Sequence, residues 1–223
     1  MILSVLISLY PVGTRLLRLA LLGCLAGVWA SVLVLLWPRR HSRLGFLLLT
    51  GAAGIFLSLP GPAVDSDLFT HEYVRFLRSF EGTPYVWGGE NGLGVDCSGL
   101  VRIGLARACG RLGFSSFNPR LLRAAFQLWW DDCTARELGT GAGGRTVPLY
   151  MAPSLNALTL GDLRPGDLAV TTDGIHVLAY LGNRRWIAAD PDRGEVVVES
   201  IPSKNSWFSR PVRVVRWRLL AAL

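Results

Sequence analysis

The chain has few of the residues from which metal sites and disulfide scaffolds are built. Its 223 residues include four cysteines and three histidines, and no two cysteines have the Cys-x-x-Cys spacing. The histidines stand far apart, at His41, His71 and His176. Zinc sites need closely spaced Cys and His ligands, and a disulfide scaffold of this size needs more cysteines. We therefore expect no metal and no cofactor.

Acidic residues are absent from the first 64 positions, although the chain has 16 of them. The same segment carries five arginines and two long apolar runs, residues 19–37 and 44–59. Composition changes sharply near Pro60-Gly61-Pro62. We therefore predict a membrane-anchoring helical hairpin at 1–64 and a folded domain at 65–223.

The net charge of +7 does not indicate a nucleic-acid partner. A nucleic-acid binder usually carries its basic patch on the folded domain. Here five arginines flank the apolar runs, and the rest of the chain has 18 basic against 16 acidic residues. Arginines beside apolar runs are typical of membrane proteins. We expect no nucleic-acid partner, and a lipid bilayer as a partner of residues 19–59.

The two apolar runs predict a hairpin of two membrane helices. Spanning a bilayer takes about 20 residues, with a lower limit of roughly 17. The first run has 19 residues; the second has 16, so it would need help from its flanks or local thinning. A cleaved signal peptide is one alternative, and a lipoprotein box ending at Cys24 is another, although Cys24 lies inside the apolar run.

The arginine distribution predicts which way the hairpin faces. The turn between the runs carries Arg39, Arg40 and Arg43, whereas the N-terminal flank carries Arg15 and Arg18. Positive residues stay on the cytoplasmic side. We therefore expect residues 65–223 to lie on the extracytoplasmic side of the membrane, which in a bacterium is the periplasm or the outer side of the cytoplasmic membrane. The sequence does not identify a membrane partner.

The domain begins with helical patterns and ends with strand patterns. Apolar spacing predicts helices over 67–80, from Cys97 onward with Asp96 as N-cap, and over 119–131. Short apolar runs separated by turns then predict five strands. Helices followed by strands indicate an α+β fold with an antiparallel sheet. The predicted strands are 168–170, 175–181, 185–190, 195–199 and 212–219.

Cys97 and His176 are the candidate catalytic pair. The first turn of a helix stabilises an anion, so we expect a lowered thiol pKa for Cys97. His176 is the only histidine after Cys97, and a Cys–His pair gives a reactive thiolate near neutral pH. Taken singly, a cysteine is usually a small buried apolar residue. The pair, together with the flanking motifs, indicates catalysis.

Two groups of motifs resemble those of the NlpC/P60 peptidases. Gly-Thr-Pro-Tyr-Val-Trp-Gly-Gly at 82–89 and Asp-Cys-Ser-Gly-Leu-Val at 96–101 are similar to the family's nucleophile segment. Arg-Pro-Gly-Asp-Leu at 164–168, with His-Val and Tyr-Leu-Gly in the following strand, is similar to its base-bearing strands. The resemblance covers roughly 68–218. Residues 107–163 are unmatched, and we interpret them as an insertion or lid.

The resemblance implies a papain-like fold and hydrolysis of peptidoglycan stem peptides, usually at the D-γ-glutamyl–diamino acid amide. It makes Cys97 the nucleophile, His176 the base, and Tyr85 a neighbour that stabilises the oxyanion. The family's third catalytic residue falls on Ala188, which cannot orient an imidazole. Asp190 shares that strand face roughly 7 Å further along. Either Asp190 or a backbone carbonyl would take the orienting role.

Three functions remain open at this point. The first is a membrane-anchored wall endopeptidase. The second is a papain-like amidase or acyltransferase acting on another acyl substrate such as lipid, and the third is an inactive wall-binding protein, which Ala188 favours. Cys109 and Cys133 are expected as buried thiols or as a disulfide. Trp129-Trp130 would either form a substrate wall or pack in a local core.

Overall fold

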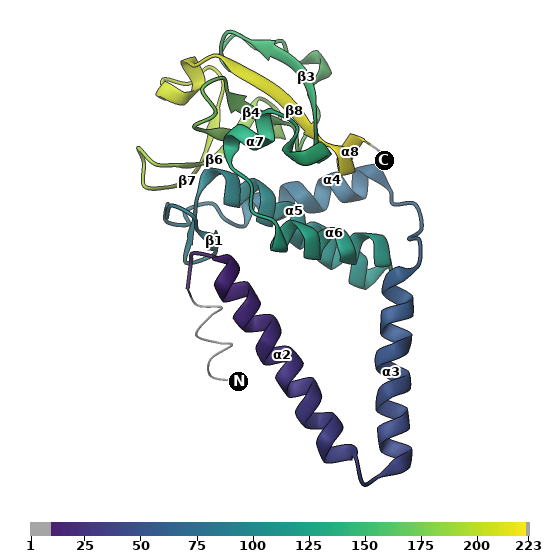
Figure 1. Cartoon of the computed structure of the whole chain (residues 1–223). Coiled ribbons are helices and arrows are strands. Elements are labelled where there is room, and N and C mark those ends of the chain that lie inside the picture. Colours follow the sequence, from purple (N-terminus) through teal and green to yellow (C-terminus); the bar gives the residue numbers. More distant parts are fainter. Residues whose placement is uncertain (1–9, 222–223) are drawn as a thin grey trace.

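The structure is a computed structural model that describes residues 10–221. Two helices, α2 (Arg15–Leu36) and α3 (Arg40–Ser58), project from a folded body as a stalk and meet at its tip (Figure 1). The Trp29 and Phe46 rings, with centroids 5.8 Å apart, join the two helices. The two apolar runs therefore form a helical hairpin.

The two stalk helices differ in whether their length and hydropathy would allow them to cross a membrane. Of the described helices, α2 alone is long and apolar enough to cross one, with a mean hydropathy of 2.5 and none of its most apolar stretch buried in the protein. α3 opens with Arg40-His41-Ser42-Arg43, and these polar residues fill its first turn. By length and composition α2 could therefore cross a membrane, and spans by α2 and by α3 both stay predictions.

The two helices predicted over 67–80 and 119–131 match within two residues at each end, and the third begins at Cys97 as predicted. α4 (Ser66–Arg78) is capped by the Asp65 carboxylate, which accepts from the Asp67 and Leu68 N–H groups at 2.8 and 3.0 Å. α5 (Cys97–Ser115) is buried along most of its length, and α6 (Pro119–Trp130) packs beside it. A short helix, α7 (Ala135–Gly139), follows.

A six-stranded antiparallel sheet forms the other layer. Its order is β3-β8-β4-β5-β6-β7, and the five predicted strands are confirmed within two residues at each end. β3 (Thr146–Ala152) was not predicted and pairs with β8 at one edge. The strands that follow are β4 (Leu168–Thr171), β5 (Val177–Gly182), β6 (Arg185–Asp190), β7 (Glu195–Ser200) and β8 (Val212–Trp217). A small ladder of β1 (Glu90–Asn91) and β2 (Gly94–Val95) precedes α5.

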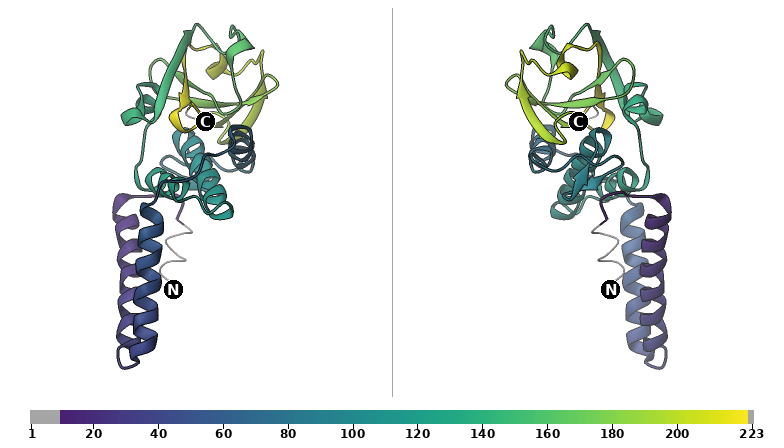
Figure 2. Two further views of the ribbon diagram at one scale, coloured as in Figure 1. Left: turned by 90° about the vertical axis from the view of Figure 1, so that its right-hand side faces the viewer. Right: turned by 90° about the vertical axis from the view of Figure 1, so that its left-hand side faces the viewer.

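The sheet separates two apolar cores. One face packs against α4 and α5, which lie between the sheet and the stalk (Figure 2). The other face is covered by the chain around 201–208, which includes the 3-10 helix η3 (Ser206–Ser209). Along β5, Val177 and Ala179 face the helices, whereas Leu178 and Tyr180 face the second core. The α+β class is confirmed.

Candidate active site

Cys97 is the first residue of α5, as the capping pattern predicts. The Asp96 carboxylate accepts from the Gly99 N–H at 2.6 Å and so caps the helix. The same carboxylate accepts from the Gly88 N–H at 2.8 Å. One acidic side chain therefore fixes both the start of the helix and the loop that precedes it.

A close backbone approach locks this loop against the helix. The Asp96 N–H donates to the Gly89 carbonyl at 3.2 Å. A Cβ on Gly99 would collide with that same carbonyl oxygen. Glycine at position 99 is therefore a steric requirement for bringing the loop to the nucleophile helix.

The Cys97 sulfur lies beside the chain that leads into β5. Cys97 is 7% exposed, and its thiol donates to the Ile175 carbonyl at 3.9 Å. It lines a cavity of about 440 Å³ whose far wall belongs to the 107–163 segment. Cys133, Thr134 and Arg136 form part of that wall. The 107–163 segment therefore builds one side of the pocket and also supplies the edge strand β3.

Burial keeps the thiol protonated. Burial and, to a smaller extent, the negative charge of Asp96 together raise the pKa of Cys97 to about 12. Backbone N–H groups of Val177, Ser98 and Cys97 itself lower the pKa by less. The predicted lowering by the helix N-terminus is therefore wrong for this structure, because desolvation of the thiolate outweighs the favourable amides.

His176 lies immediately before β5 and is almost fully buried. Its ring stacks on Trp207 with centroids 4.2 Å apart, and its backbone N–H donates to the Thr171 hydroxyl at 3.0 Å. Among the described residues, Nε2 of the imidazole has no hydrogen-bond partner. Burial lowers the pKa of His176 to about 4, although the Asp190 carboxylate opposes this shift. The imidazole is therefore neutral at physiological pH.

Cys97 and His176 line two neighbouring spaces. His176 borders the space around Trp207 and Asp190, whereas its neighbour Ile175 borders the Cys97 cavity. Within residues 10–221, no hydrogen bond joins the sulfur to the imidazole. The backbone of residues 175–177 is what brings the two residues together. Their catalytic pairing stays a prediction.

Asp190 reaches the histidine's surroundings but is held by other donors. Its carboxylate accepts from the Asn205 amide at 2.7 Å and from Trp207 Nε1 at 3.3 Å. It also accepts from the backbone N–H groups of Asp192 and Arg193. No hydrogen bond within the described residues joins it to His176. Asp190 can therefore act on the imidazole through its charge and through Trp207.

The position of the missing third residue is apolar, as the sequence indicates. Ala188 is 4% exposed and lines the same space as His176 and Asp190. Trp207 and Asn205 also line this space, and sequence reasoning missed both. Asn205 caps the η3 turn by accepting from the Trp207 N–H at 3.1 Å. In the sequence, Asn205 two residues before Trp207 predicts only a local turn, so it could not have shown that these residues lie near His176.

Tyr85 lines the Cys97 cavity, together with the 80% exposed Trp87. Burial is the main cause that raises the pKa of Tyr85 to about 12, and the nearby Asp96 carboxylate contributes in the same direction. The phenol is therefore a neutral hydroxyl, which can donate a hydrogen bond to a developing oxyanion.

The remaining cysteines and tryptophans lie as follows. Cys109 and Cys133 are buried free thiols, so the thiol alternative holds in this structure. Trp129 and Trp130 are partly buried on α6; the Trp130 ring stacks with Phe126, and the Trp129 ring packs against it at a tilt. Trp129 lines a cavity beside α2, and neither tryptophan lines the Cys97 cavity. The interpretation as a substrate wall at the nucleophile is therefore wrong.

The chain was compared with known proteins. The family model described as "NlpC/P60 family" matches residues 82–216, more than half of the chain and including the nucleophile loop and the histidine strand. No curated protein matches.

Among solved structures, NlpC1 from Trichomonas vaginalis is similar at 18% identity with a TM-score of 0.44; the match covers 66% of this chain and 43% of that one. The peptidoglycan hydrolase RipB from Mycobacterium tuberculosis is similar at 22% identity with a TM-score of 0.42, covering 74% and 76%. A family protein from Bacillus cereus matches at 17% identity with a TM-score of 0.42, covering 71% and 41%. The chain thus spans less than half of the Trichomonas and Bacillus proteins. On the family match over 82–216, the chain belongs to the NlpC/P60 family.

Proposed function

We propose that the protein is a membrane-anchored cysteine endopeptidase that hydrolyses the D-γ-glutamyl–diamino acid amide of peptidoglycan stem peptides. The observation that carries the proposal is the placement of Cys97. It begins a buried helix, opens into a cavity of about 440 Å³ and lies against the backbone that leads to His176. Family membership supports the same substrate class.

The resting site holds a neutral thiol and a neutral imidazole, so the proton must move as the substrate reacts. His176 takes the Cys97 proton while the sulfur attacks the amide carbonyl. Catalytic hydrogen bonds are often unmade in a free enzyme and form when the substrate is bound. The Asp190 charge favours the imidazolium that results.

The later steps use groups that line the Cys97 cavity. The Cys97 backbone N–H and the Tyr85 hydroxyl stabilise the tetrahedral oxyanion. The imidazolium of His176 then protonates the leaving amine, which breaks the C–N bond and leaves a thioester. Water, deprotonated by the imidazole, hydrolyses the thioester to release the γ-carboxylate and restore the thiol.

The cavity carries both signs of charge, which suits a stem peptide. Asp132 and Arg136 lie on its insertion side, and Asp132 is 62% exposed. Arg136 is oriented by its hydrogen bond to the Asp173 carbonyl at 2.9 Å. A diamino acid next to the scissile bond brings an amine and a carboxylate, which these two side chains complement.

The stalk supports anchoring with the body on the extracytoplasmic side. The 22 residues of α2 give roughly 33 Å of helix, enough for a hydrocarbon core of about 30 Å. Arg39, Arg40 and Arg43 gather at the stalk tip, the end away from the body. Positive residues favour the cytoplasm, so the body lies across the membrane. A reporter fused to the C-terminus should give a periplasmic signal; a cytoplasmic signal refutes this placement.

Mass spectrometry of muropeptides incubated with the full chain in nanodiscs tests the activity. Wild type should cut between D-glutamate and the diamino acid, and Cys97→Ala should cut nothing. Cys133→Ala is the matched control, because Cys133 is also a buried thiol that lines the same cavity. Cleavage by Cys97→Ala, or equal loss in both variants, would show that Cys97 is not the nucleophile.

One observation favours a second function, an inactive wall-binding protein. Ala188 leaves the imidazole without the usual polar partner, and Nε2 of His176 has none in this structure. In that case wild type would co-sediment with peptidoglycan and leave every muropeptide intact, and Cys97→Ala would bind equally well.

A further inference from the structure

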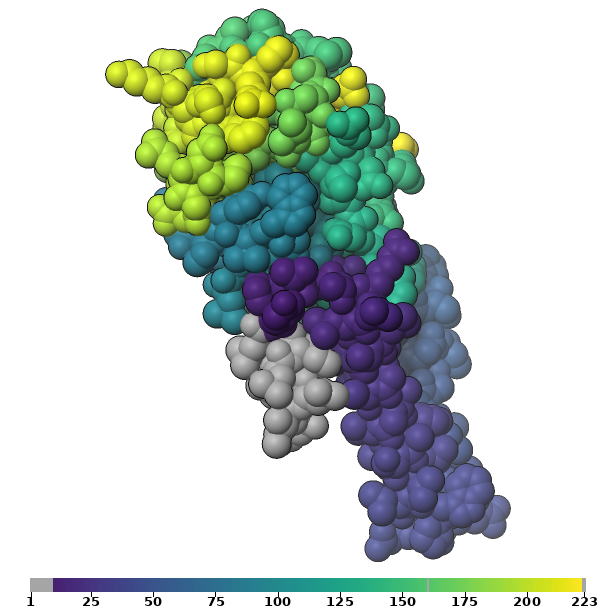
Figure 3. Space-filling model, turned by 60° about the vertical axis from the view of Figure 1, so that its left-hand side comes forward, coloured from purple at the N-terminus to yellow at the C-terminus, as the bar shows by residue number. Residues whose placement is uncertain are grey.

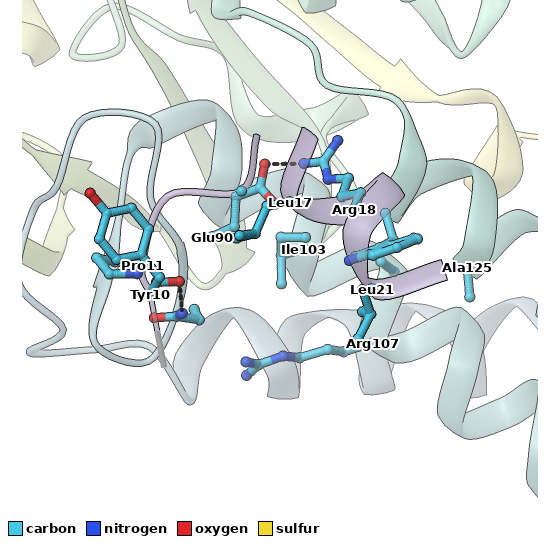
Figure 4. Close-up of a pocket in the computed structure, with 13 residues that line it drawn as sticks. Tyr10, Pro11, Leu17, Arg18, Leu21, Glu90, Ile103, Arg107 and Ala125 are labelled. Atoms are coloured by element: carbon cyan, nitrogen blue, oxygen red, sulfur yellow. Dashed lines mark hydrogen bonds and ion pairs between the residues drawn. The ribbon is translucent and has the colours of Figure 1, made fainter. Parts of the chain in front are cut away.

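A second cavity lies where the stalk joins the body. It measures about 390 Å³, within the roughly 300–1,000 Å³ range of small-molecule sites. One wall is the beginning of α2, with Leu17 and Leu21, and the other comes from the body helices α5 and α6 (Figure 4). The apolar side chains on the body side include Ile103 and Trp129.

The α2 wall is held firmly to the body. Arg18 is 3% exposed; it pairs with Glu90 at 2.5 Å and donates to the Trp130 carbonyl at 2.7 Å. Just before α2, the Pro11 carbonyl accepts from the Glu90 N–H at 2.8 Å. Figure 3 shows the start of α2 seated against the body. The cavity is therefore bounded by docked elements on both sides.

One of the charged side chains that line the cavity, that of Arg107, is exposed to solvent. Arg18 is neutralised by Glu90, but Arg107, which also lines the cavity, forms no ion pair with any carboxylate in residues 10–221. Its guanidinium lies over the Phe80 ring, 4.5 Å from the centroid. Partial burial lowers the pKa of Arg107, and no acidic group opposes this shift. An anion at this point would gain a partner without displacing one.

The neighbouring surface is that of a protein at a membrane interface. α6 lies across the base of the body, between the body ends of α2 and α3 (Figure 1). Arg123 of α6 donates to the Leu57 and Leu59 carbonyls of the α3 end. Phe126, Trp129 and Trp130 cluster with ring centroids 5.7–6.2 Å apart. Tryptophans in such a position mark the headgroup level of a bilayer.

We propose that this cavity binds an anionic phospholipid, with the phosphate at Arg107 and an acyl chain along Leu17 and Leu21. The proposal rests on the membrane span by α2 and is independent of peptidase activity. The ligand follows from the chemistry of the lining, which is apolar beside a lipid-exposed helix and carries one unpaired cation. A lipid there would also fill the space between stalk and body.

Native mass spectrometry of the full chain in mild detergent tests the proposal. We expect dioleoyl phosphatidylglycerol to be retained over dioleoyl phosphatidylcholine, and Arg107→Gln to reduce that preference about fivefold, the effect of one basic residue near anionic lipid. Arg111→Gln is the matched control, because Arg111 lies one turn along α5 and pairs with Glu72. No lipid preference in wild type, or equal effects of both substitutions, overturns the proposal.

A second variant covers the case in which Arg107→Gln fails to fold. Ala125→Phe places a ring in the cavity and should abolish retention of phosphatidylglycerol at an unchanged melting temperature. A third variant, which lacks residues 2–9, tests whether the cavity is occupied by lipid or by the N-terminus of the chain itself. If lipid is retained only after that deletion, the N-terminus fills the cavity and the proposal is wrong. The readout is bound lipid, so a failed muropeptide assay leaves it unaffected.

Discussion

Glu90 is a single carboxylate shared by two buried guanidinium groups. It contacts Arg18 of the stalk and Arg102 of α5, whose side chains are 3% and 1% exposed. Glu90→Gln leaves these two cations facing each other, and Asp132, 3.4 Å from Arg102 but 62% exposed, compensates only weakly. Removing one partner of a buried ion pair costs about 3–5 kcal/mol. At roughly 2–4 °C per kcal/mol, the melting temperature should fall by about 6–20 °C.

Glu72 supplies the matched control. It is also a mostly buried carboxylate, 11% exposed, and contacts two arginines. Arg75 and Arg111 are 46% and 59% exposed, so Glu72→Gln leaves no desolvated charge and should cost about 0–1 kcal/mol. Thermal unfolding of the full-length variants in one detergent, followed by tryptophan fluorescence, gives both values. Equal losses of stability in the two variants would refute the reasoning, because the burial of the arginines would then not determine how much stability is lost.

Three further predictions concern the active site. The kcat/KM should hold its neutral-pH value down to about pH 5 and then decrease with a pKa near 4, because His176 must be unprotonated to act as a base. Asp190→Asn should move this decrease to lower pH, because the Asp190 carboxylate raises the pKa of His176. Tyr85→Phe should lower kcat about 10²–10³-fold with little change in KM, as expected for a lost oxyanion donor. Gly99→Ala should destabilise the fold by about 1–3 kcal/mol in thermal unfolding, because its Cβ meets the Gly89 carbonyl.

The beginning of α5 could be predicted from the sequence because every signal for it is local. Asp96 precedes the apolar pattern by one residue, and its carboxylate caps the helix three residues on. The strands were equally readable, since tight turns separate short apolar runs. β3 was not predicted because Pro148 interrupts it and only Thr146 is buried, so no apolar alternation marks one face of the strand.

The direction of the His176 ring could not be predicted. Alternation places His176 on the face of Leu178 and Tyr180, but both faces of β5 are buried, so the apolar pattern does not distinguish them. The packing of Trp207 on the second face decides the surroundings of the ring. The prediction of a lowered pKa for the Cys97 thiol failed for a related reason. The helix-end effect is local and visible in the sequence, whereas the desolvation that outweighs it depends on contacts with distant segments.

Arg18 shows how the anchor and the active site become connected. In the sequence, its position at the start of an apolar run is typical of a membrane-flanking charge. In the structure, it pairs with Glu90 of β1, which lies 72 positions away. The loop that carries Glu90 also carries Gly88 and Gly89, whose backbone groups bind Asp96 beside the nucleophile. The first turn of α2 therefore holds the same loop that sets the start of α5. A stalk attached in this way is part of the scaffold of the proposed active site, and an unrelated membrane helix in its place would restore the proposed anchoring without restoring the buried ion pair.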